Sequence, residues 1–312
     1  PPVFLSTSFL IGTKKILNPL AIFINTIGYV IFSIKLSKYI LKNNFDLVVT
    51  NGMNPHFYGG LAAKISNKPV VFRLMDVISK KMIFGFAIML FEFFAKFVKA
   101  KIIVPSKSVS KLMFSQTFSD LNTKVIYNAT DTSDFNPKIS RQILREEYEI
   151  NEKTLVFGCY SRLVPWKGHK VFIDAAIEYL NNGLKAKFLV VGGSLFEKND
   201  FMNELMIKVE QSGYVNDIIF TGFRYDMSNC MFSSDVVVVP SIYPDPCPRV
   251  MVESMALKKP IIGSNIGGIP EVVVHNKTGL IFEAGDYNDL KNCFSYFNEN
   301  RNQITFMGEQ GY

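Results

Sequence analysis

The sequence predicts an α/β protein built from two doubly wound, mostly parallel sheets. From residue 45 onward, short runs of Val, Ile, Leu and Phe alternate with segments long enough to form helices. Such alternation is typical of βαβ units, in which helices cover both faces of a parallel sheet. The chain has 312 residues, 48% of them apolar, which is enough for two domains with a core each.

The expected strands fall into two series, separated by a polar and turn-rich stretch. The first series is 46–50, 69–74, 101–105 and 124–127, and the second is 154–160, 187–191, 217–221, 235–240, 260–263 and 279–282. The separating stretch, 131–152, contains one short polar helix at 141–148. We therefore expect a first domain over 1–135, a hinge, and a second domain over 151–312.

The charge of the chain bears on its partners. The formal net charge is +7 and the calculated pI is about 9.1, which suggests phosphorylated substrates, anionic lipid or nucleic acid. Nucleic acid is not favoured, because the sequence has no zinc-finger spacing, no aromatic RNA-binding signature and no dense Lys/Arg run. An ordinary basic enzyme with no polyanionic partner is the alternative.

The cysteines and histidines predict neither disulfides nor a metal site. Four Cys residues are scattered without a CxxC pair, and the three His residues are widely spaced. This usage fits a reducing compartment, so a cytoplasmic protein is expected. Peripheral attachment to the inner face of a membrane stays open.

Two apolar helical stretches raise the question of a membrane. The stretch 20–41 holds Asn25, Ser33 and Lys35, and the stretch 80–101 carries six Phe residues together with Glu92. A spanning helix needs about 20 apolar residues with almost no charge, so core or surface helices are favoured. Contact with an anionic bilayer surface is the alternative for 80–101, because five lysines accompany its Phe residues: Lys80, Lys81, Lys96, Lys99 and Lys101.

A cationic loop follows the strand at 154–160. Arg162 and Lys167 lie five positions apart in the run YSRLVPWKG, between a strand and a helix. Ligands bind at the carboxyl ends of strands in open α/β sheets. Arg supplies a bidentate fork and Lys a compact charge, so both could bind a diphosphate. Ordinary surface cations are the alternative.

Two glycine-rich turns follow other strands. Gly192 and Gly193 end the strand at 187–191, where glycine lets the backbone approach a ligand closely. Gly267 and Gly268 precede a helix that has Pro270 near its start, a place where free N–H groups favour phosphate. Neither turn is a GxGxxG fingerprint or a phosphate-binding loop of the GxxxxGK[ST] type. Tight turns without a ligand are the alternative.

Two carboxylates flank an expected helix entry. Asp245 precedes a helix expected from about Pro248 to Leu257, and Glu253 lies two turns into it. Ionised carboxylates form strong hydrogen bonds to hydroxyl groups, so this pair suits a sugar and a ribose. A surface Glu on an amphipathic helix is the alternative.

In this order and spacing, these segments resemble the retaining GT-B glycosyltransferases of family four (glycosyl transferases group 1). The resembling runs are YSRLVPWKGHKVFIDAA, VVGGS, IIFTGF and SSDVVVVPSIYPDPCPRVMVESMALKKPIIGSNIGGIPEVVVHNKTGLIF. Weaker likeness extends upstream through VIYNATDTSDFNP, DLVVTNGMNPHFYGGLAAK and PVVFRLMD. The resemblance covers most of the chain and implies two Rossmann-like doubly wound domains facing a central cleft.

The resemblance also implies roles for single residues. Arg162 and Lys167 would bind the donor diphosphate and stabilise it as the leaving group, while Glu253 would bind the ribose. Asp245 would contact the transferred sugar. The segments that would flank the base, phosphates and sugar contain Gly192, Gly193, Thr221, Gly222, Arg224, Gly267 and Gly268.

The sequence departs from the family pattern at two sites. Asp245 stands where the family has Glu, which shortens the stem by one methylene and leaves the sugar open. Met75 and Asp76 stand where the family often has a His-Asp pair. Asp76 could act in catalysis instead, or His56, expected on the preceding loop, could contact the acceptor.

The implied reaction is metal-independent transfer of a sugar from a nucleotide-diphosphate-sugar to a glycan or lipid-linked acceptor, with retention through front-face attack. No cofactor is expected, and polysaccharide or lipopolysaccharide synthesis is the expected setting. The nucleotide of the donor could be UDP, GDP or ADP. An inactive remnant that binds nucleotide sugar or protein partners, an epimerase and a phosphorylase are the alternatives. Compared with the family the chain lacks an opening strand and the last helices, so a partial sequence is expected.

Overall fold

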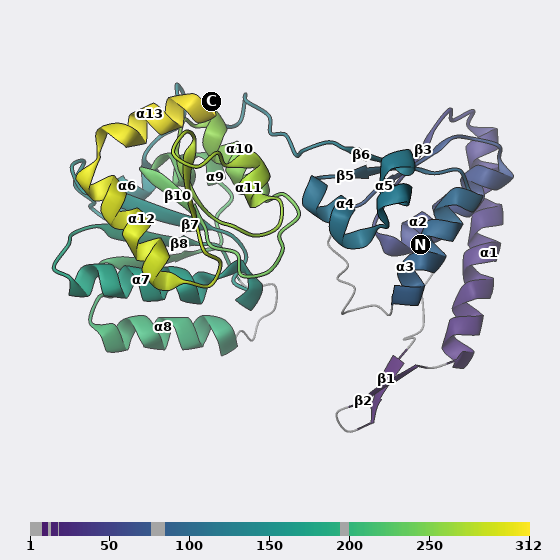
Figure 1. Cartoon of the computed structure of the whole chain (residues 1–312), viewed down its shortest axis with the longest axis horizontal. Helices are drawn as coiled ribbons and strands as arrows, with labels where there is room; N and C mark the ends of the chain where they lie inside the picture. Colours follow the sequence, from purple (N-terminus) through teal and green to yellow (C-terminus); the bar gives the residue numbers. More distant parts are fainter. Residues whose placement is uncertain (1–7, 12–13, 18, 76–84, 194–199) are drawn as a thin grey trace. The chain divides into compact units, whose positions relative to one another are not determined.

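The computed structural model describes residues 8–11, 14–17, 19–75, 85–193 and 200–312. The chain divides into two compact units, Pro1–Ile126 and Tyr127–Tyr312 (Figure 1). Each unit contains a parallel sheet with helices, so the predicted α/β class is confirmed.

The first unit contains a four-stranded parallel sheet in the order β3-β4-β5-β6. These strands are β3 (Val48–Asn51), β4 (Val70–Arg73), β5 (Lys101–Val104) and β6 (Thr123–Val125), and the sequence predicted all four. The helices are α1 (Pro19–Lys42), α2 (Met53–Ile65), α3 (Gly85–Phe97), α4 (Lys107–Met113) and α5 (Gln116–Asn122). A hairpin of β1 (Ser8–Ile11) and β2 (Lys14–Leu17) was not predicted.

The second unit contains a six-stranded parallel sheet in the order β12-β11-β10-β7-β8-β9. Its strands are β7 (Val156–Tyr160), β8 (Lys187–Val191), β9 (Ile218–Gly222), β10 (Val236–Val239), β11 (Ile261–Ser264) and β12 (Gly279–Phe282). This is the doubly wound order. The chain starts at β7 in the middle, adds β8 and β9 on one side, and then adds β10, β11 and β12 on the other, so the strand order reverses between β7 and β10. The predicted second series of strands is confirmed.

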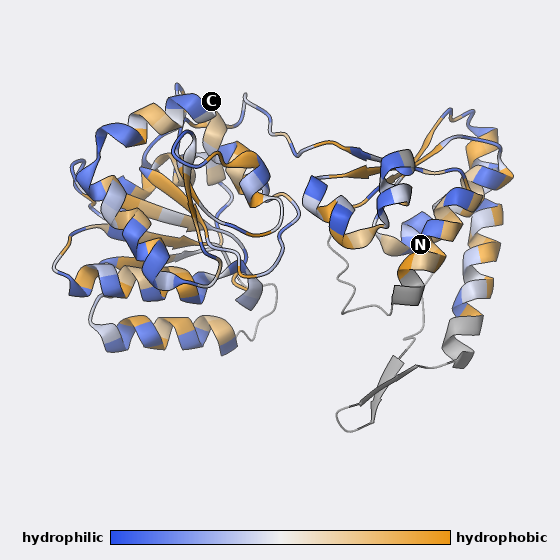
Figure 2. Ribbon diagram, viewed as in Figure 1, coloured by the Kyte–Doolittle hydropathy of each residue, from blue (hydrophilic) through white to orange (hydrophobic). Residues whose placement is uncertain are grey.

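Helices cover both faces of the second sheet. They are α6 (Ile143–Glu147), α7 (His169–Asn181), α8 (Asp200–Ser212), α9 (Met227–Phe232), α10 (Arg249–Ala256), α11 (Ile269–Val272), α12 (Tyr287–Glu299) and α13 (Asn302–Gly311). On one face Phe157 and Phe188 pack with Phe294 of α12, and on the other Val191 and Val237 pack in the cluster of Met251. The strands are accordingly apolar on both sides (Figure 2).

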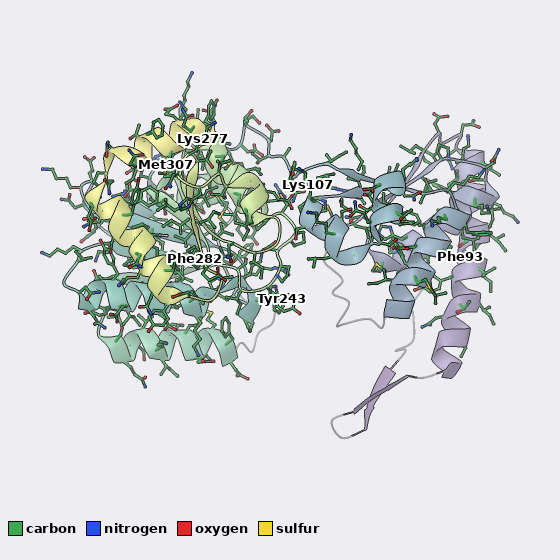
Figure 3. The ribbon with its side chains drawn as sticks, viewed as in Figure 1. Phe93, Lys107, Tyr243, Lys277, Phe282 and Met307 are labelled. Carbon is green, nitrogen blue, oxygen red and sulfur yellow. The ribbon has the colours of Figure 1, made fainter. Side chains whose placement is uncertain are left out.

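The core of the second unit extends to the end of the chain. Phe282 and Met307 are 1% and 0% exposed and belong to the α7–α12 side of the core (Figure 3). Helix α12 begins after Asp286, whose carboxylate accepts hydrogen bonds from the N–H groups of Asn288 and Asp289. Such a cap satisfies donors that the helix itself leaves unpaired.

The division between the units lies earlier than the predicted end of the first domain at 135. Residues after 126 pack on the second unit instead of forming a free hinge. Asn128 Nδ2 donates to Cys247 O at 2.7 Å, and the buried Arg145 guanidinium forms an ion pair with Asp235 at 2.8 Å. The short predicted helix is α6, and it is held there because Leu144 N donates to Ser233 Oγ.

The segment 80–101, with its six Phe residues, contributes both to the core and to the surface of the first unit. Lys80 and Lys81 lie outside the described residues, and the helix spans Gly85–Phe97. Phe91 belongs to the core of the first unit, whereas Phe93 and Phe97 are 69% and 48% exposed (Figure 3). Core packing and an exposed apolar face therefore occur on one helix. None of the described helices is long and apolar enough to span a bilayer.

The two units differ strongly in charge. The first unit holds 16 Lys/Arg against 4 Asp/Glu, a formal net charge of +12. The second unit holds 18 Lys/Arg against 23 Asp/Glu, a formal net charge of −5. The basic character of the chain therefore belongs entirely to the first unit.

Candidate functional site

A cavity of about 300 Å³ lies at the carboxyl ends of the strands of the second unit, where the strand order reverses between β7 and β10. Ligands of doubly wound sheets bind at this switch point. Five predicted site residues line it: Arg162, Lys167, Gly192, Gly193 and Glu253. They come from two loops, after β7 and after β8, and from helix α10, which meet because parallel strands end at the same edge.

The cationic loop connects β7 to a 3₁₀ turn (Pro165–Lys167) ahead of α7. Two backbone hydrogen bonds attach it to the β8 side, from Ser161 N to Val191 O and from Leu163 N to Gly193 O, both at 3.1 Å. The Arg162 side chain forms no ion pair among the described residues. A guanidinium carries five N–H donors, which suits it to bind an anionic ligand.

Lys167, which lines the cavity, forms an ion pair with Asp245, which is not among the lining residues. Lys167 Nζ lies 2.5 Å from Asp245 Oδ2, and Ser241 Oγ donates to the same oxygen at 3.2 Å. Only 19% and 11% of the two side chains are exposed. The carboxylate predicted to contact the sugar thus also holds the cation predicted to contact the diphosphate.

Gly192 is required by a close approach of two backbones. Its φ is +147°, and a Cβ there would collide with the Ser161 carbonyl oxygen. A larger residue would therefore push the cationic loop away from β8. Gly193 packs beside the Phe223 side chain, which lines the same cavity.

Gly267 and Gly268 do not line the cavity but support the loop that carries Asp245. Gly268 N donates to Asp245 O at 2.8 Å. Gly267 has a φ of +65°, and a Cβ there would collide with the Asp245 backbone. The glycine-rich turn before α11 therefore fixes the main chain of Asp245.

Glu253 lies one turn along α10 from a cation that the sequence interpretation missed. Arg249 Nη2 lies 3.1 Å from Glu253 Oε1, and both residues line the cavity. Burial raises the pKa of Glu253, while Arg249 lowers it. The missed signal was the spacing itself, because an Arg four residues before a Glu shares its helix face.

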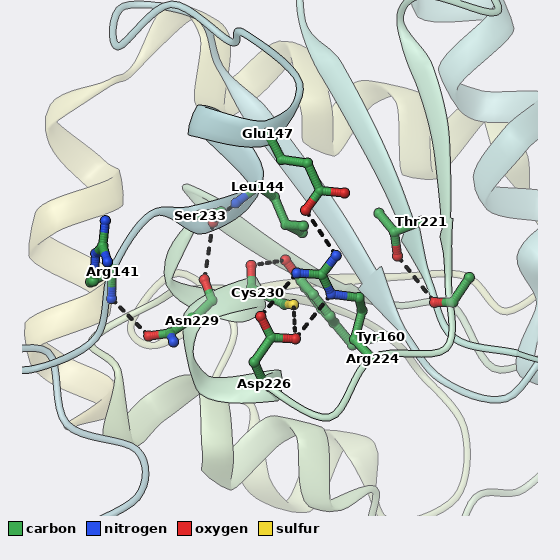
Figure 4. Close-up of polar contacts among 11 residues, drawn as sticks. Arg141, Leu144, Glu147, Tyr160, Thr221, Arg224, Asp226, Asn229, Cys230 and Ser233 are labelled. Carbon is green, nitrogen blue, oxygen red and sulfur yellow. Dashed lines mark hydrogen bonds and ion pairs between the residues drawn. The ribbon is translucent and has the colours of Figure 1, made fainter.

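The segment 221–224 contributes differently from the expectation. Phe223, which was not singled out, lines the cavity, whereas Thr221, Gly222 and Arg224 are absent from its lining. Arg224 Nη1 lies 2.8 Å from Glu147, and Arg224 Nη2 lies 2.9 Å from Asp226 (Figure 4). Arg224 thereby connects α6 to the loop before α9, and contact of its guanidinium with a base stays a prediction.

The predicted groups of the first unit are placed as follows. Asp76 lies outside the described residues. His56 was expected on a loop, but it lies in α2 and is fully buried, because the helix begins directly after Gly52. Its Nδ1 shares a hydrogen bond of 2.6 Å with Thr50 Oγ1, and its ring stacks on Phe72. Burial lowers the pKa of His56 to about 4, so the ring is neutral at pH 7.

Two buried ionisable groups of the second unit are also neutral at pH 7. Burial raises the pKa of Cys159 to about 12 and lowers that of His169 to about 4. His169 Nε2 lies 3.1 Å from Ser161 Oγ, so a neutral ring supports the cationic loop. Across the described parts of the chain, no group of three or more His, Cys, Asp or Glu residues is arranged to hold a metal ion.

Comparison with known proteins agrees with this geometry. Residues 140–312 match the family model "Glycosyl transferases group 1", and residues 11–134 match "Glycosyltransferase Family 4". The chain is 25% identical over 273 residues to a UDP-Gal:α-D-GlcNAc-diphosphoundecaprenol α-1,3-galactosyltransferase of Escherichia coli, covering 83% of this chain and 68% of that protein.

A second relative is a GDP-mannose-dependent α-(1-6)-phosphatidylinositol monomannoside mannosyltransferase of Mycobacterium tuberculosis. It is 27% identical over 190 residues, which cover 58% of this chain and 48% of the enzyme. Among solved structures, HepE of Anabaena in complex with UDP is similar, with a TM-score of 0.80 and 26% identity over 89% of this chain and 75% of HepE. HepE was also solved with UDP-glucose.

The first of the two family models covers more than half of the chain, and its match contains the whole cavity of the second unit. The chain belongs to the glycosyl transferases group 1, with the GT-B type of fold.

Proposed function

We propose that this chain acts as a retaining glycosyltransferase that moves a sugar from a nucleotide-diphosphate-sugar to a glycan or lipid-linked acceptor. The observation that carries the proposal is one cavity at the switch point that unites Arg162, Lys167 and Glu253. Two cations suit a diphosphate and a buried carboxylate suits ribose hydroxyls. HepE, with a similar fold, binds UDP and UDP-glucose.

The same residues support departure of the diphosphate without a metal ion. Negative charge develops on the bridging oxygen as the bond to the anomeric carbon breaks. Preorganised cations lower the barrier to such a step, and Arg162 and Lys167 are positioned on one loop to supply them. Lys167 is held in place by Asp245 before any ligand arrives.

Retention is proposed to occur by attack on the face from which the diphosphate leaves. A double displacement needs a carboxylate nucleophile beside the anomeric carbon. Both acids of this site are engaged with cations, Asp245 with Lys167 and Glu253 with Arg249. This pairing favours the other route, in which the acceptor oxygen bonds to the anomeric carbon and its proton passes to the departing phosphate.

The acceptor is proposed to be borne by a membrane lipid. The first unit carries a net charge of +12 and exposes Phe93 and Phe97 on α3. Lysines near an anionic surface and exposed aromatic residues both favour binding to a bilayer surface. The E. coli relative is named for a diphosphoundecaprenol-linked acceptor.

A donor screen with the purified chain tests this function. UDP-, GDP- and ADP-sugars are titrated into the protein by calorimetry. The donor that binds most tightly is then labelled in its sugar and incubated with the protein and extracted bacterial lipids. The expected result is a labelled lipid-linked product with retained anomeric configuration. Donor binding without transfer would support an inactive remnant, and no binding of any nucleotide sugar would refute the proposal.

A further inference from the structure

Arg249 and Glu253 differ sharply in exposure although they form one ion pair. The Arg249 side chain is 64% exposed, whereas that of Glu253 is 12% exposed and lies in the wall of the donor cavity. An ion pair with both partners exposed contributes little to stability. Here the Glu253 carboxyl is largely shielded from water, so the charge of Arg249 has a larger effect on its ionisation.

The state of the Glu253 carboxyl decides what it can bind. An ionised carboxylate accepts two or more hydrogen bonds, which suits the two hydroxyls of a ribose, whereas a protonated one must donate one of its own. Burial alone raises the pKa of Glu253, and Arg249 opposes that rise. The nearby cation therefore favours the form that binds hydroxyls.

The other charged or titratable groups around this cavity do not take the place of Arg249. Cys159 and Tyr160 of β7 stay neutral, because burial raises the pKa of each. Lys167 is occupied by Asp245. Arg162 is the remaining cation of the lining, and no ion pair joins it to Glu253 in the described parts of the chain.

We propose that Arg249 is a positioning residue that keeps the Glu253 carboxylate ionised and oriented to accept the hydroxyls of a nucleoside diphosphate. The proposal rests on the proposed function, since it assigns Glu253 to the donor. It adds a determinant of donor affinity on the same helix face, one turn before the acid.

The experiment compares the Arg249→Gln and Glu253→Gln variants of the whole 312-residue chain, the combined variant and wild type. Arg141→Gln is the matched control, because Arg141 and Glu146 form an ion pair of the same 3.1 Å length with both side chains exposed. The Glu253 carboxyl is titrated by ¹³C NMR without ligand, and binding of UDP and of GDP is measured by calorimetry from pH 5.5 to 8.5.

Loss of the Arg249 charge favours the protonated acid, so the titration of Glu253 should move to higher pH. Binding of the nucleotide should then fall most at the acid end of this range, by up to about tenfold for each unit of pKa, and recover towards pH 8.5. Arg141→Gln should change neither measurement. In the Glu253→Gln background, removal of Arg249 should have little further effect.

Two results would overturn the proposal. The first is an unchanged Glu253 titration in Arg249→Gln. The second is an equal loss of affinity when Arg249 is replaced in the Glu253→Gln background, which would mean that the guanidinium contacts the nucleotide itself. If wild type binds neither nucleotide, the proposed function fails, while the NMR titration still decides whether Arg249 controls the ionisation of Glu253.

Discussion

The ammonium group of Lys167 lies 2.5 Å from the carboxylate of Asp245, although the two residues are 78 positions apart in the sequence. The pair joins the loop after β7 to the loop before α10, the two loops that border the switch point. A cation that would otherwise sample many rotamers is thereby held at one place in the cavity, which is the arrangement that electrostatic catalysis needs.

Replacing Arg162 or Lys167 by Ala should lower transfer by at least about 100-fold, the effect of losing one preorganised charge contact. The two variants should differ in stability. Arg162→Ala should unfold at the wild-type temperature, whereas Lys167→Ala leaves the 11%-exposed Asp245 without its cation and should unfold at a lower one. Thermal melts and product assays check this, and wild-type turnover in both variants would contradict it.

Asp245→Asn and Glu253→Gln should damage different steps. Asp245→Asn releases Lys167 and removes the predicted sugar contact, so transfer should suffer more than binding of the bare nucleotide. Glu253→Gln should weaken binding of the bare nucleotide as well, because its carboxylate is assigned to the ribose. Calorimetry with UDP or GDP, beside turnover measurements, separates the two. Equal losses of nucleotide affinity would show that the assignment of roles is wrong.

Transfer should continue in EDTA. Arg162 and Lys167 are proposed to provide positive charge for the departing diphosphate, so chelation of divalent ions should change the rate by less than about twofold, against the several kcal/mol that a catalytic metal supplies. Initial rates with and without EDTA, and after addition of Mg²⁺ or Mn²⁺, provide the test. Activity that disappears on chelation and returns with either ion would require a metal-dependent mechanism.

Acid should destabilise the fold through two buried histidines. His56 and His169 have pKa values of about 4, below the unfolded value of 6.5, because both are fully buried. The neutral rings therefore stabilise the folded state fully above pH 6.5, and this contribution is lost as the pH falls towards 4. Each is on the order of 3 kcal/mol. Urea denaturation at stepped pH should show a shallower decline in His169→Gln than in wild type, and an identical decline would contradict the prediction.

The exposed face of α3 should bind anionic membranes. Changing Phe93 and Phe97 together to Ser should reduce co-sedimentation with vesicles that contain phosphatidylglycerol, and added salt should weaken the electrostatic part. The matched control is Phe306→Ser, an exposed Phe of α13 in the acidic second unit. Wild type that ignores such vesicles, or a double variant that binds them as well as wild type, would assign α3 to another role.

Much of the fold was predictable because it depends on local pattern. Parallel strands covered on both faces leave continuous apolar runs, so both series of strands were found. Five of the residues predicted for the site lie around one cavity, since loops that follow parallel strands end at one edge, while their roles stay predictions. The β1–β2 hairpin was missed because it is antiparallel and lies before residue 45, outside the alternation of strands and helices from which the others were predicted.

What could not be predicted are the partners of charged side chains. Arg224 belongs to a segment expected to flank the base, which stays a prediction, and its ion pairs with Glu147, 77 positions away, and with Asp226 were not foreseen. Which of several nearby acids an Arg selects depends on the packing of α6, and this packing is decided by the whole unit. The position of His56 in a helix could not be predicted either, because no apolar periodicity marks the start of α2.

In the proposed donor site, the glycines that hold the loops in place are different residues from the side chains that line the cavity. Gly192 holds the cationic loop against β8, and Gly267 holds the main chain of Asp245, both through contacts between backbones. Side chains such as Phe223 and Arg249 line the cavity without forming these contacts. We therefore expect single substitutions of lining residues to change the preference of the proposed site for one donor over another while its loops stay in place.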